Sequence, residues 1–221
     1  MDWLEYIAAF AGFFVAHNLP TRPAVKAQLQ TFLGMRGFSI AYSLLSLGAL
    51  YWLLLAAGRA PVVTLWHWAP WQNLVPIVAM ALFCGILCFG VARPNPFSFG
   101  GARNEQFDPL RPGQIRYMRH PILVALALWA FAHMVPNGHL AHVILFTVFG
   151  GFALLGMRLI DRRKQHEMAD WSDQVTVMKD APLLPPLRHW PGAALRLIIA
   201  VLLYVSVLHA HAPLFGVSPL P

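Results

Sequence analysis

The sequence predicts an all-α membrane protein: a polytopic bundle of six transmembrane helices with the N- and C-termini outside. Three observations lead to this fold class. Of the 221 residues, 58% are hydrophobic and only 11% are charged, whereas soluble domains carry about 25% charged residues. Six charge-poor segments come close to the roughly 20 residues that a helix needs to cross the hydrocarbon of a bilayer. Finally, lysine and arginine gather in alternate loops, as membrane insertion favours.

The six predicted spans follow one another along a single domain that covers residues 1–221. They lie at residues 3–19, 38–57, 74–92, 119–135, 139–157 and 194–211. The fourth and fifth spans form a tight hairpin, because residues 120–157 contain no Asp, Glu, Lys or Arg and are interrupted only by Pro-Asn-Gly at 136–138, which is a turn signal.

Two loops have features of their own. Residues 23–35 begin with a proline, which suits the first helical turn, and their apolar side chains recur at helical spacing: Val25, Leu29, Phe32 and Leu33. This pattern predicts a short helix lying on the membrane surface. Residues 158–190 are polar and basic, with prolines towards their end, and they form the largest soluble part of the chain.

The distribution of positive charge predicts the orientation. The first, third and fifth loops hold three, five and six of the sixteen Lys and Arg residues, whereas the second holds only Arg59 and the fourth holds none. Loops rich in Lys and Arg stay in the cytoplasm, so both termini lie outside. The net charge of +7 is therefore explained by insertion and lipid headgroups, and no nucleic acid partner is predicted.

Several classes of chemistry lack a motif in this sequence. Neither a nucleotide-binding loop nor metalloprotease spacing is present, so ATP-driven and hydrolytic functions have no support. Cys84 and Cys88 lie one helical turn apart in an uncharged segment, which does not indicate a disulfide framework. They are interpreted as small apolar residues that pack between helices.

Three histidines at the ends of predicted spans are candidate functional residues. His17 closes the first span, His120 opens the fourth, and His133 lies near the outer end of the fourth, within LWAFAHMVP. Ionisable residues in spanning helices are costly and are functional candidates by default, and imidazole is a common ligand for metals and haem iron. Each histidine either binds a metal centre or forms hydrogen bonds at a helix end.

Two arginines directly precede His120 in the sequence RYMRHP. Arg116 and Arg119 fall on the predicted inner side, where guanidinium groups bind either the phosphates of lipids or the propionates of a porphyrin. The sequence is compatible with both kinds of ligand, lipid phosphate and porphyrin propionate.

Two long stretches of the sequence resemble the NnrU family of bacterial membrane proteins, whose plant relatives are the 15-cis-zeta-carotene isomerases. They are AHNLPTRPAVKAQLQTFLGMRGFSIAYSLLSLGALYWLL and RHPILVALALWAFAHMVPNGHLAHVILFTVFGGFALLGMRLIDRR. The likeness covers roughly residues 4–175. Its specific parts are a histidine that ends the first span, the His-Pro that opens the fourth, LWA followed by His133, and the Asn-Gly turn.

The resemblance implies an integral protein of the bacterial inner membrane linked to nitric oxide and denitrification metabolism, or haem b-dependent isomerisation of a polyene as in the plant branch. It implies His17 and His133 as haem ligands and metal-binding residues and His120 as a further functional histidine. With a haem bound, the position of Arg116 and Arg119 before His120 predicts that they hold its propionates. Membrane lipid and a membrane protein of respiration or denitrification are the implied partners. Where the isomerases carry a cysteine three residues before the second histidine, this chain has Ala130.

Two alternative functions are kept beside this one. GQIRYMRHP resembles the signature of membrane methyltransferases that act on isoprenylcysteine or phospholipid with S-adenosylmethionine. In this chain, however, the segment continues with ILVA, and the paired glutamates of those enzymes are reduced to Glu167. The other alternative is a non-enzymatic assembly factor for a respiratory reductase.

The spacing of the histidines limits which of them share a metal. Thirteen residues separate His120 from His133, which is roughly 20 Å along a helix axis. One helix cannot bring both of its ends to one iron, so each histidine needs a partner from another element. His17 matches His120 in predicted depth, whereas the family resemblance pairs it with His133, and the sequence leaves the second ligand open.

Overall fold

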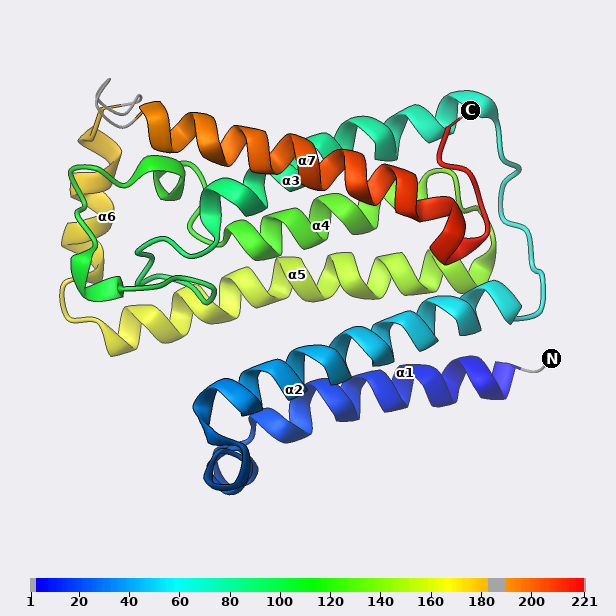
Figure 1. The fold of residues 1–221 in the computed structure, drawn as a ribbon, viewed down its shortest axis with the longest axis horizontal. Helices are drawn as coiled ribbons and strands as arrows, with labels where there is room; N and C mark the ends of the chain where they lie inside the picture. The colour runs from blue at the N-terminus through cyan, green and yellow to red at the C-terminus, as the bar shows by residue number, and fades with distance from the viewer. Residues whose placement is uncertain (1–2, 183–189, 221) are drawn as a thin grey trace. The chain divides into compact units, whose positions relative to one another are not determined.

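The computed structural model describes residues 3–182 and 190–220, and this part of the chain is all-helical. It contains no β-strand, and a single isolated bridge pairs Thr64 with His139. The predicted all-α class is therefore confirmed. The α-helices in Figure 1 are α1 (Trp3–Asn18), α2 (Pro23–Arg59), α3 (Leu74–Gly90), α4 (Pro121–Met134), α5 (Leu140–Glu167), α6 (Trp171–Asp180) and α7 (Trp190–Phe215). Four short 3-10 helices are η1 (Leu19–Thr21), η2 (Pro70–Asn73), η3 (Asn104–Gln106) and η4 (Gly113–Arg116).

Each of the six segments predicted to cross the membrane contains an α-helix. Within the described residues, four helical ranges are long and apolar enough to span a bilayer: Pro23–Arg59, Pro70–Gly90, Leu140–Glu167 and Pro191–Phe215. The other two segments form α1, with 16 residues, and α4, with 14 residues. Both are shorter than the roughly 20 residues of a typical span.

Helix α2 bends at Gly34, where the backbone has φ +70° and ψ 169°. Only glycine adopts this conformation readily, because it has no Cβ atom. A Cβ added at this position would meet open space, so the backbone angle and not crowding requires glycine here. In Figure 1 the residues before the bend are seen nearly end-on and those after it run lengthwise. The predicted helix over residues 23–35 is thus present, and it turns away from the span that follows.

One compact unit consists of α1, α2 and the start of α5. It comprises Met1–His67 and Gly138–Leu145. The ring of Trp52 packs directly on Gly12, where an added Cβ atom would come within 2.8 Å of the indole. The Tyr6 hydroxyl donates a hydrogen bond to the carbonyl oxygen of Ala141 at 2.5 Å. Small residues and a buried tyrosine therefore hold the three helical segments together.

The second compact unit contains the remaining helices. It comprises Trp68–Asn137 and Phe146–Pro221. Within it, α3, α4, α7 and most of α5 run lengthwise in Figure 1, and α6 lies across one end. Glycines on α5 allow close approach to α4: an added Cβ at Gly150 would meet the Phe131 ring at 2.5 Å, and one at Gly156 would meet Leu123 at 3.3 Å.

Helix α5 continues well beyond residue 157, the predicted end of the fifth span, into a charged and polar stretch. Its last turns are stabilised by ion pairs of Glu167 with Arg163 at 3.5 Å and with Lys164 at 2.9 Å. Helix α6 follows α5 and lies in the predicted soluble region, residues 158–190. Residues 183–189 of that region lie outside the described part of the chain. Helix α6 packs on the loop before α4 through an apolar cluster of Phe97, Ile115, Val175 and Met178, which positions that loop beside α5.

Candidate functional site

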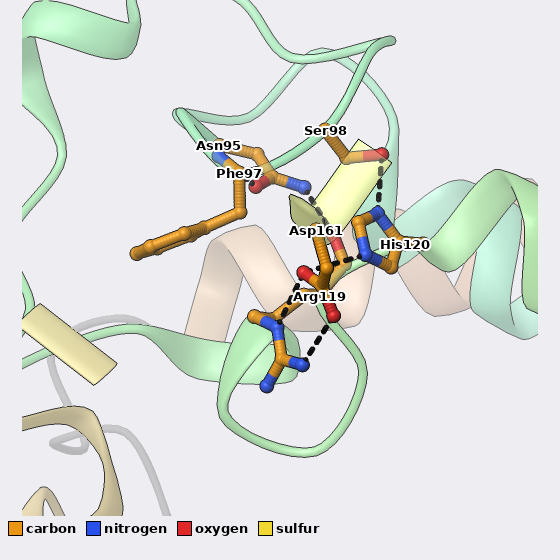
Figure 2. A network of polar contacts seen from close by, with 6 residues as sticks. All are labelled: Asn95, Phe97, Ser98, Arg119, His120 and Asp161. Atoms are coloured by element: carbon orange, nitrogen blue, oxygen red, sulfur yellow. Dashed lines mark hydrogen bonds and ion pairs between the residues drawn. The ribbon is translucent and has the colours of Figure 1, made fainter. Parts of the chain in front are cut away.

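His120 lies at the centre of a polar network at the start of α4. Its side chain is 4% exposed, and both ring nitrogens have partners, as Figure 2 shows: Nδ1 lies 3.0 Å from Ser98 Oγ, and Nε2 lies 3.0 Å from Asp161 Oδ1. A carboxylate only accepts, so Nε2 carries the proton and Nδ1 accepts from the serine hydroxyl. Neither nitrogen of His120 keeps a lone pair for a metal in this arrangement.

Asp161 binds Arg119 as well as His120. The guanidinium donates through Nε to Oδ1 at 3.1 Å and through Nη2 to Oδ2 at 2.6 Å, which is the bidentate geometry that makes such pairs strong. The guanidinium carbon also lies 5.7 Å from the centre of the Trp171 ring, so a cation–π contact joins the pair to α6. The Asp161 carboxylate on α5 therefore holds the start of α4 in place through Arg119 and His120.

The carboxyl of Asp161 lies beyond the predicted end of the fifth span and stays ionised. Burial raises its pKa, but the hydrogen bonds and positive charge of Arg119, together with the contact with His120, outweigh burial and bring the pKa below its usual value. An ionised carboxylate is the state that accepts from both the guanidinium and the imidazole. The charge of Asp161 therefore supports the assignment of the proton to Nε2 of His120.

The loop before α4 is shaped by Asn95, which is 1% exposed. Its Nδ2 donates to the carbonyl oxygen of Arg119 at 2.9 Å, and its Oδ1 accepts from the backbone N–H of Phe97 at 3.1 Å. The side chain of Asn104 in turn accepts from the backbone N–H of Asn95 at 2.9 Å. These bonds hold Ser98 against His120 (Figure 2).

Serine, histidine and aspartate in a row resemble a nucleophile, its base and the acid that orients the base. Ser98, however, is only 8% exposed, so its hydroxyl is not open to a substrate. Both nitrogens of the neutral imidazole are already hydrogen-bonded, one to Ser98 and the other to Asp161, at 3.0 Å each. The network therefore anchors the fold.

His17 ends α1 and contacts Tyr42 of α2. The Tyr42 hydroxyl donates to the carbonyl oxygen of His17 at 3.0 Å, and the same hydroxyl oxygen lies 3.3 Å from His17 Nδ1. The single hydroxyl proton goes to the carbonyl, so Nδ1 is the donor of the second contact and the lone pair of the ring is on Nε2. The ring also stacks on Phe13, with centroids 5.5 Å apart and planes 11° apart.

His133 lies in the last turn of α4 among aromatic side chains. Its Nδ1 is 2.9 Å from the carbonyl oxygen of Trp129, and its ring centroid is 5.6 Å from that of Trp129 and 5.9 Å from that of Phe146. A carbonyl oxygen can only accept, so Nδ1 carries the proton and Nε2 holds the lone pair. His133 and His17 thus share one tautomer, which differs from the hydrogen-bonded state of His120.

The predicted site residues do not all meet in one place. His120 and His133 lie at opposite ends of α4, and the structure joins His120 to Arg119 through Asp161. His17 belongs to the first compact unit and the other two histidines to the second, so the pairing of His17 with either of them stays a prediction. Nη1 of Arg116 is buried and has no hydrogen-bond partner among the described residues.

Sequence reasoning did not identify Ser98, Asn95 or Asp161. One signal for Asp161 was available, because it is the only acidic residue between positions 120 and 166 and is surrounded by arginines. An isolated acid at the charged end of a span has several basic partners to choose from, and a functional or anchoring role is the usual reason for its presence. No comparable signal marks Ser98 or Asn95.

A comparison with protein families covers nearly the whole chain. The model of the family described as NnrU protein matches residues 5–219, a range that includes all three candidate histidines. Searches of curated proteins and of solved structures gave no significant match.

Proposed function

Because this chain belongs to the NnrU family, we propose that it is a haem b-binding protein of the bacterial inner membrane, with His17 and His133 as axial ligands. The observation that carries the proposal is a contact that the two rings share: Nδ1 lies 3.3 Å from the Tyr42 hydroxyl oxygen in His17 and 2.9 Å from the Trp129 carbonyl oxygen in His133. Each uses Nδ1–H for a hydrogen bond to an oxygen and keeps its lone pair on Nε2. Metal-ligating histidines commonly donate their other N–H in this way, which orients the ring and raises its basicity.

His120 is the weaker candidate for the second ligand. Both of its nitrogens are engaged at 3.0 Å, so ligation would break the contact with Ser98 or that with Asp161. Arg116 and Arg119 would bind the propionates only if His120 were a ligand. These arginines lie at the His120 end of α4, and roughly 20 Å of helix separates that end from His133. In the His17 and His133 arrangement these arginines instead hold the start of α4 or bind lipid phosphate.

A bound haem b supplies a redox-active iron, and the protein supplies ligation, orientation and a dry environment. We propose a role linked to nitric oxide or denitrification metabolism, together with a respiratory membrane protein as partner, in preference to polyene isomerisation. The reason is Ala130, which is fully buried where the resembled isomerases have a cysteine. A thiol ligand is therefore missing near the end of α4. Arg119, which a methyltransferase would use for S-adenosylmethionine, is already paired with Asp161.

The proposal predicts a coloured protein. Wild-type protein purified in mild detergent from haem-replete cells should show a Soret band and close to one haem b per chain by pyridine haemochrome assay. A colourless protein that also fails to take up added hemin would contradict haem binding and would favour the assembly-factor alternative.

We further propose that all six predicted segments cross the membrane, with both termini outside and loops one, three and five in the cytoplasm. This topology places His17 and His120 near the inner side and His133 near the outer side, so it favours His120 as the second ligand and competes with the pairing of His17 and His133. The support is the distribution of Lys and Arg and the helix found in each segment. Reporter fusions at Pro221 and near Gln174 should give opposite signals, with the fusion near Gln174 in the cytoplasm. The reverse pattern would contradict the proposed orientation. Equal signals would place both sites on the same side of the membrane and would contradict a single crossing between Gln174 and Pro221.

A further inference from the structure

The segment of α2 before the Gly34 bend exposes large apolar side chains. Val25, Leu29, Phe32 and Leu33 recur at helical spacing, and Phe32 is 84% exposed and Leu33 49% exposed. Residues at positions i, i+4, i+7 and i+8 share one helix face. A soluble surface rarely presents such a face without a partner, so something other than water covers it in the native environment.

All charged residues of this segment and of its two flanks are basic. Arg22, Lys26 and Arg36 are all exposed, and none of them takes part in the ion pairs found among the described residues. The sequence has no Asp or Glu between positions 6 and 104, so no acid nearby in the chain can neutralise them. The charge of this segment is complementary to an anionic partner.

The bend fixes where this segment lies relative to a bilayer. Residues 35–59 continue as a helix that is roughly 37 Å long, enough to cross about 30 Å of hydrocarbon and to reach into both headgroup layers. Gly34 then falls at one boundary of the membrane. Because the chain turns away from the span at Gly34 (Figure 1), residues 23–33 must run along that boundary.

We propose that residues 23–33 form an interfacial helix that binds anionic phospholipid, with its apolar face in the acyl boundary and with Lys26 and the flanking Arg22 and Arg36 on the headgroup phosphates. This inference requires that α2 crosses the membrane, and it is independent of haem binding. A basic amphipathic helix at the membrane surface has both features that such binding needs, namely apolar area and positive charge. A second protein chain would satisfy the apolar face but would have to supply acidic groups as well.

The first test measures the depth of two adjacent positions. Phe32→Cys and Thr31→Cys, each in a Cys84→Ala/Cys88→Ala background, carry a nitroxide label in the full-length protein reconstituted in vesicles of phosphatidylglycerol and phosphatidylcholine. We expect the Phe32 label to be reached by oxygen from the lipid and the Thr31 label by a water-soluble nickel chelate. Equal exposure of both labels to the chelate, or dipolar broadening between Phe32 labels of two copies, would overturn the proposal.

The second test measures lipid selectivity. Native mass spectrometry of protein from the same mixed bilayers should show retained phosphatidylglycerol. Arg22→Gln/Lys26→Gln should lower its preference over phosphatidylcholine by roughly tenfold, since each basic residue near an anionic surface contributes several-fold to binding. Arg162→Gln/Lys179→Gln is the matched control, because it removes the same net charge from exposed positions of α5 and α6. Equal losses in the two variants, or no preference in the wild type, would overturn the proposal.

Discussion

His133→Ala is expected to remove the Soret band from the purified protein or to shift it strongly. The proposed axial bond requires the Nε2 lone pair, which the Nδ1 contact with Trp129 leaves available, and alanine offers no replacement. His17→Ala should have the same effect, because His17 is the other proposed ligand. The measurement is the absorption spectrum, normalised to protein and followed by titration with hemin, so that loss of affinity is distinguished from loss of haem during purification.

Two further histidines serve as controls for this experiment. His209 makes the same type of contact, with Nδ1 2.8 Å from the carbonyl oxygen of Val205 four residues earlier, but it is exposed on α7. His209→Ala should therefore keep the wild-type spectrum. His120→Ala should keep the haem while lowering stability. Retention of full haem content by His133→Ala, combined with its loss in His120→Ala, would reverse the assignment of the second ligand.

Asp161→Asn is expected to cause the largest loss of stability among single substitutions in the described network. The amide cannot balance the Arg119 guanidinium, and the carboxylate accepts three hydrogen bonds, so the NH2 group would face at least one donor whichever oxygen it replaced. Breaking a largely buried pair costs about 3–5 kcal/mol. Because Asp161 and Arg119 are 21% and 34% exposed, we expect about 2–3 kcal/mol, measured by thermal unfolding in detergent.

Glu167→Gln is the matched control on the same helix. Its carboxylate pairs with Arg163 and Lys164 at the exposed end of α5, where water and salt screen the charges and ion pairs contribute little to stability. The apparent melting temperature of this variant should stay close to that of the wild type. Equal losses in the two variants would show that the His120 network contributes no more than a surface ion pair.

The sequence allowed the helices to be predicted, but not the network. The charge-free run from 120 to 157 identified α4 and α5, and the Pro-Asn-Gly turn between them was correct, because length and polarity decide what can lie in a bilayer. His120 was correctly placed at the start of α4. Its partners Ser98 and Asp161 lie 22 and 41 residues away in the chain, and such contacts depend on how the loop folds.

Residues of the membrane surface were harder to interpret than those of the spans. The helix over residues 23–35 followed from its apolar spacing, yet α6 was not predicted, because its residues lie in a polar stretch whose pattern resembles a solvated loop. Its position is decided by Val175 and Met178, which are buried against the loop before α4. Tertiary packing of this kind overrides local propensity.

The first compact unit is discontinuous along the chain, and this has a consequence for biosynthesis. Besides the Tyr6 contact, Leu65 donates to the carbonyl of Gly138 at 2.8 Å and Leu140 donates to that of Val63 at 2.8 Å, so α1 and α2 lack part of their packing until residues 138–145 have been made. At roughly 5–20 residues per second, the ribosome needs several seconds to add the roughly seventy intervening residues. During this interval the exposed face of the N-terminal hairpin is open to lipid, chaperones or proteases. Mutations in the Gly138 turn should therefore act first on the yield of inserted protein and only later on its properties once folded.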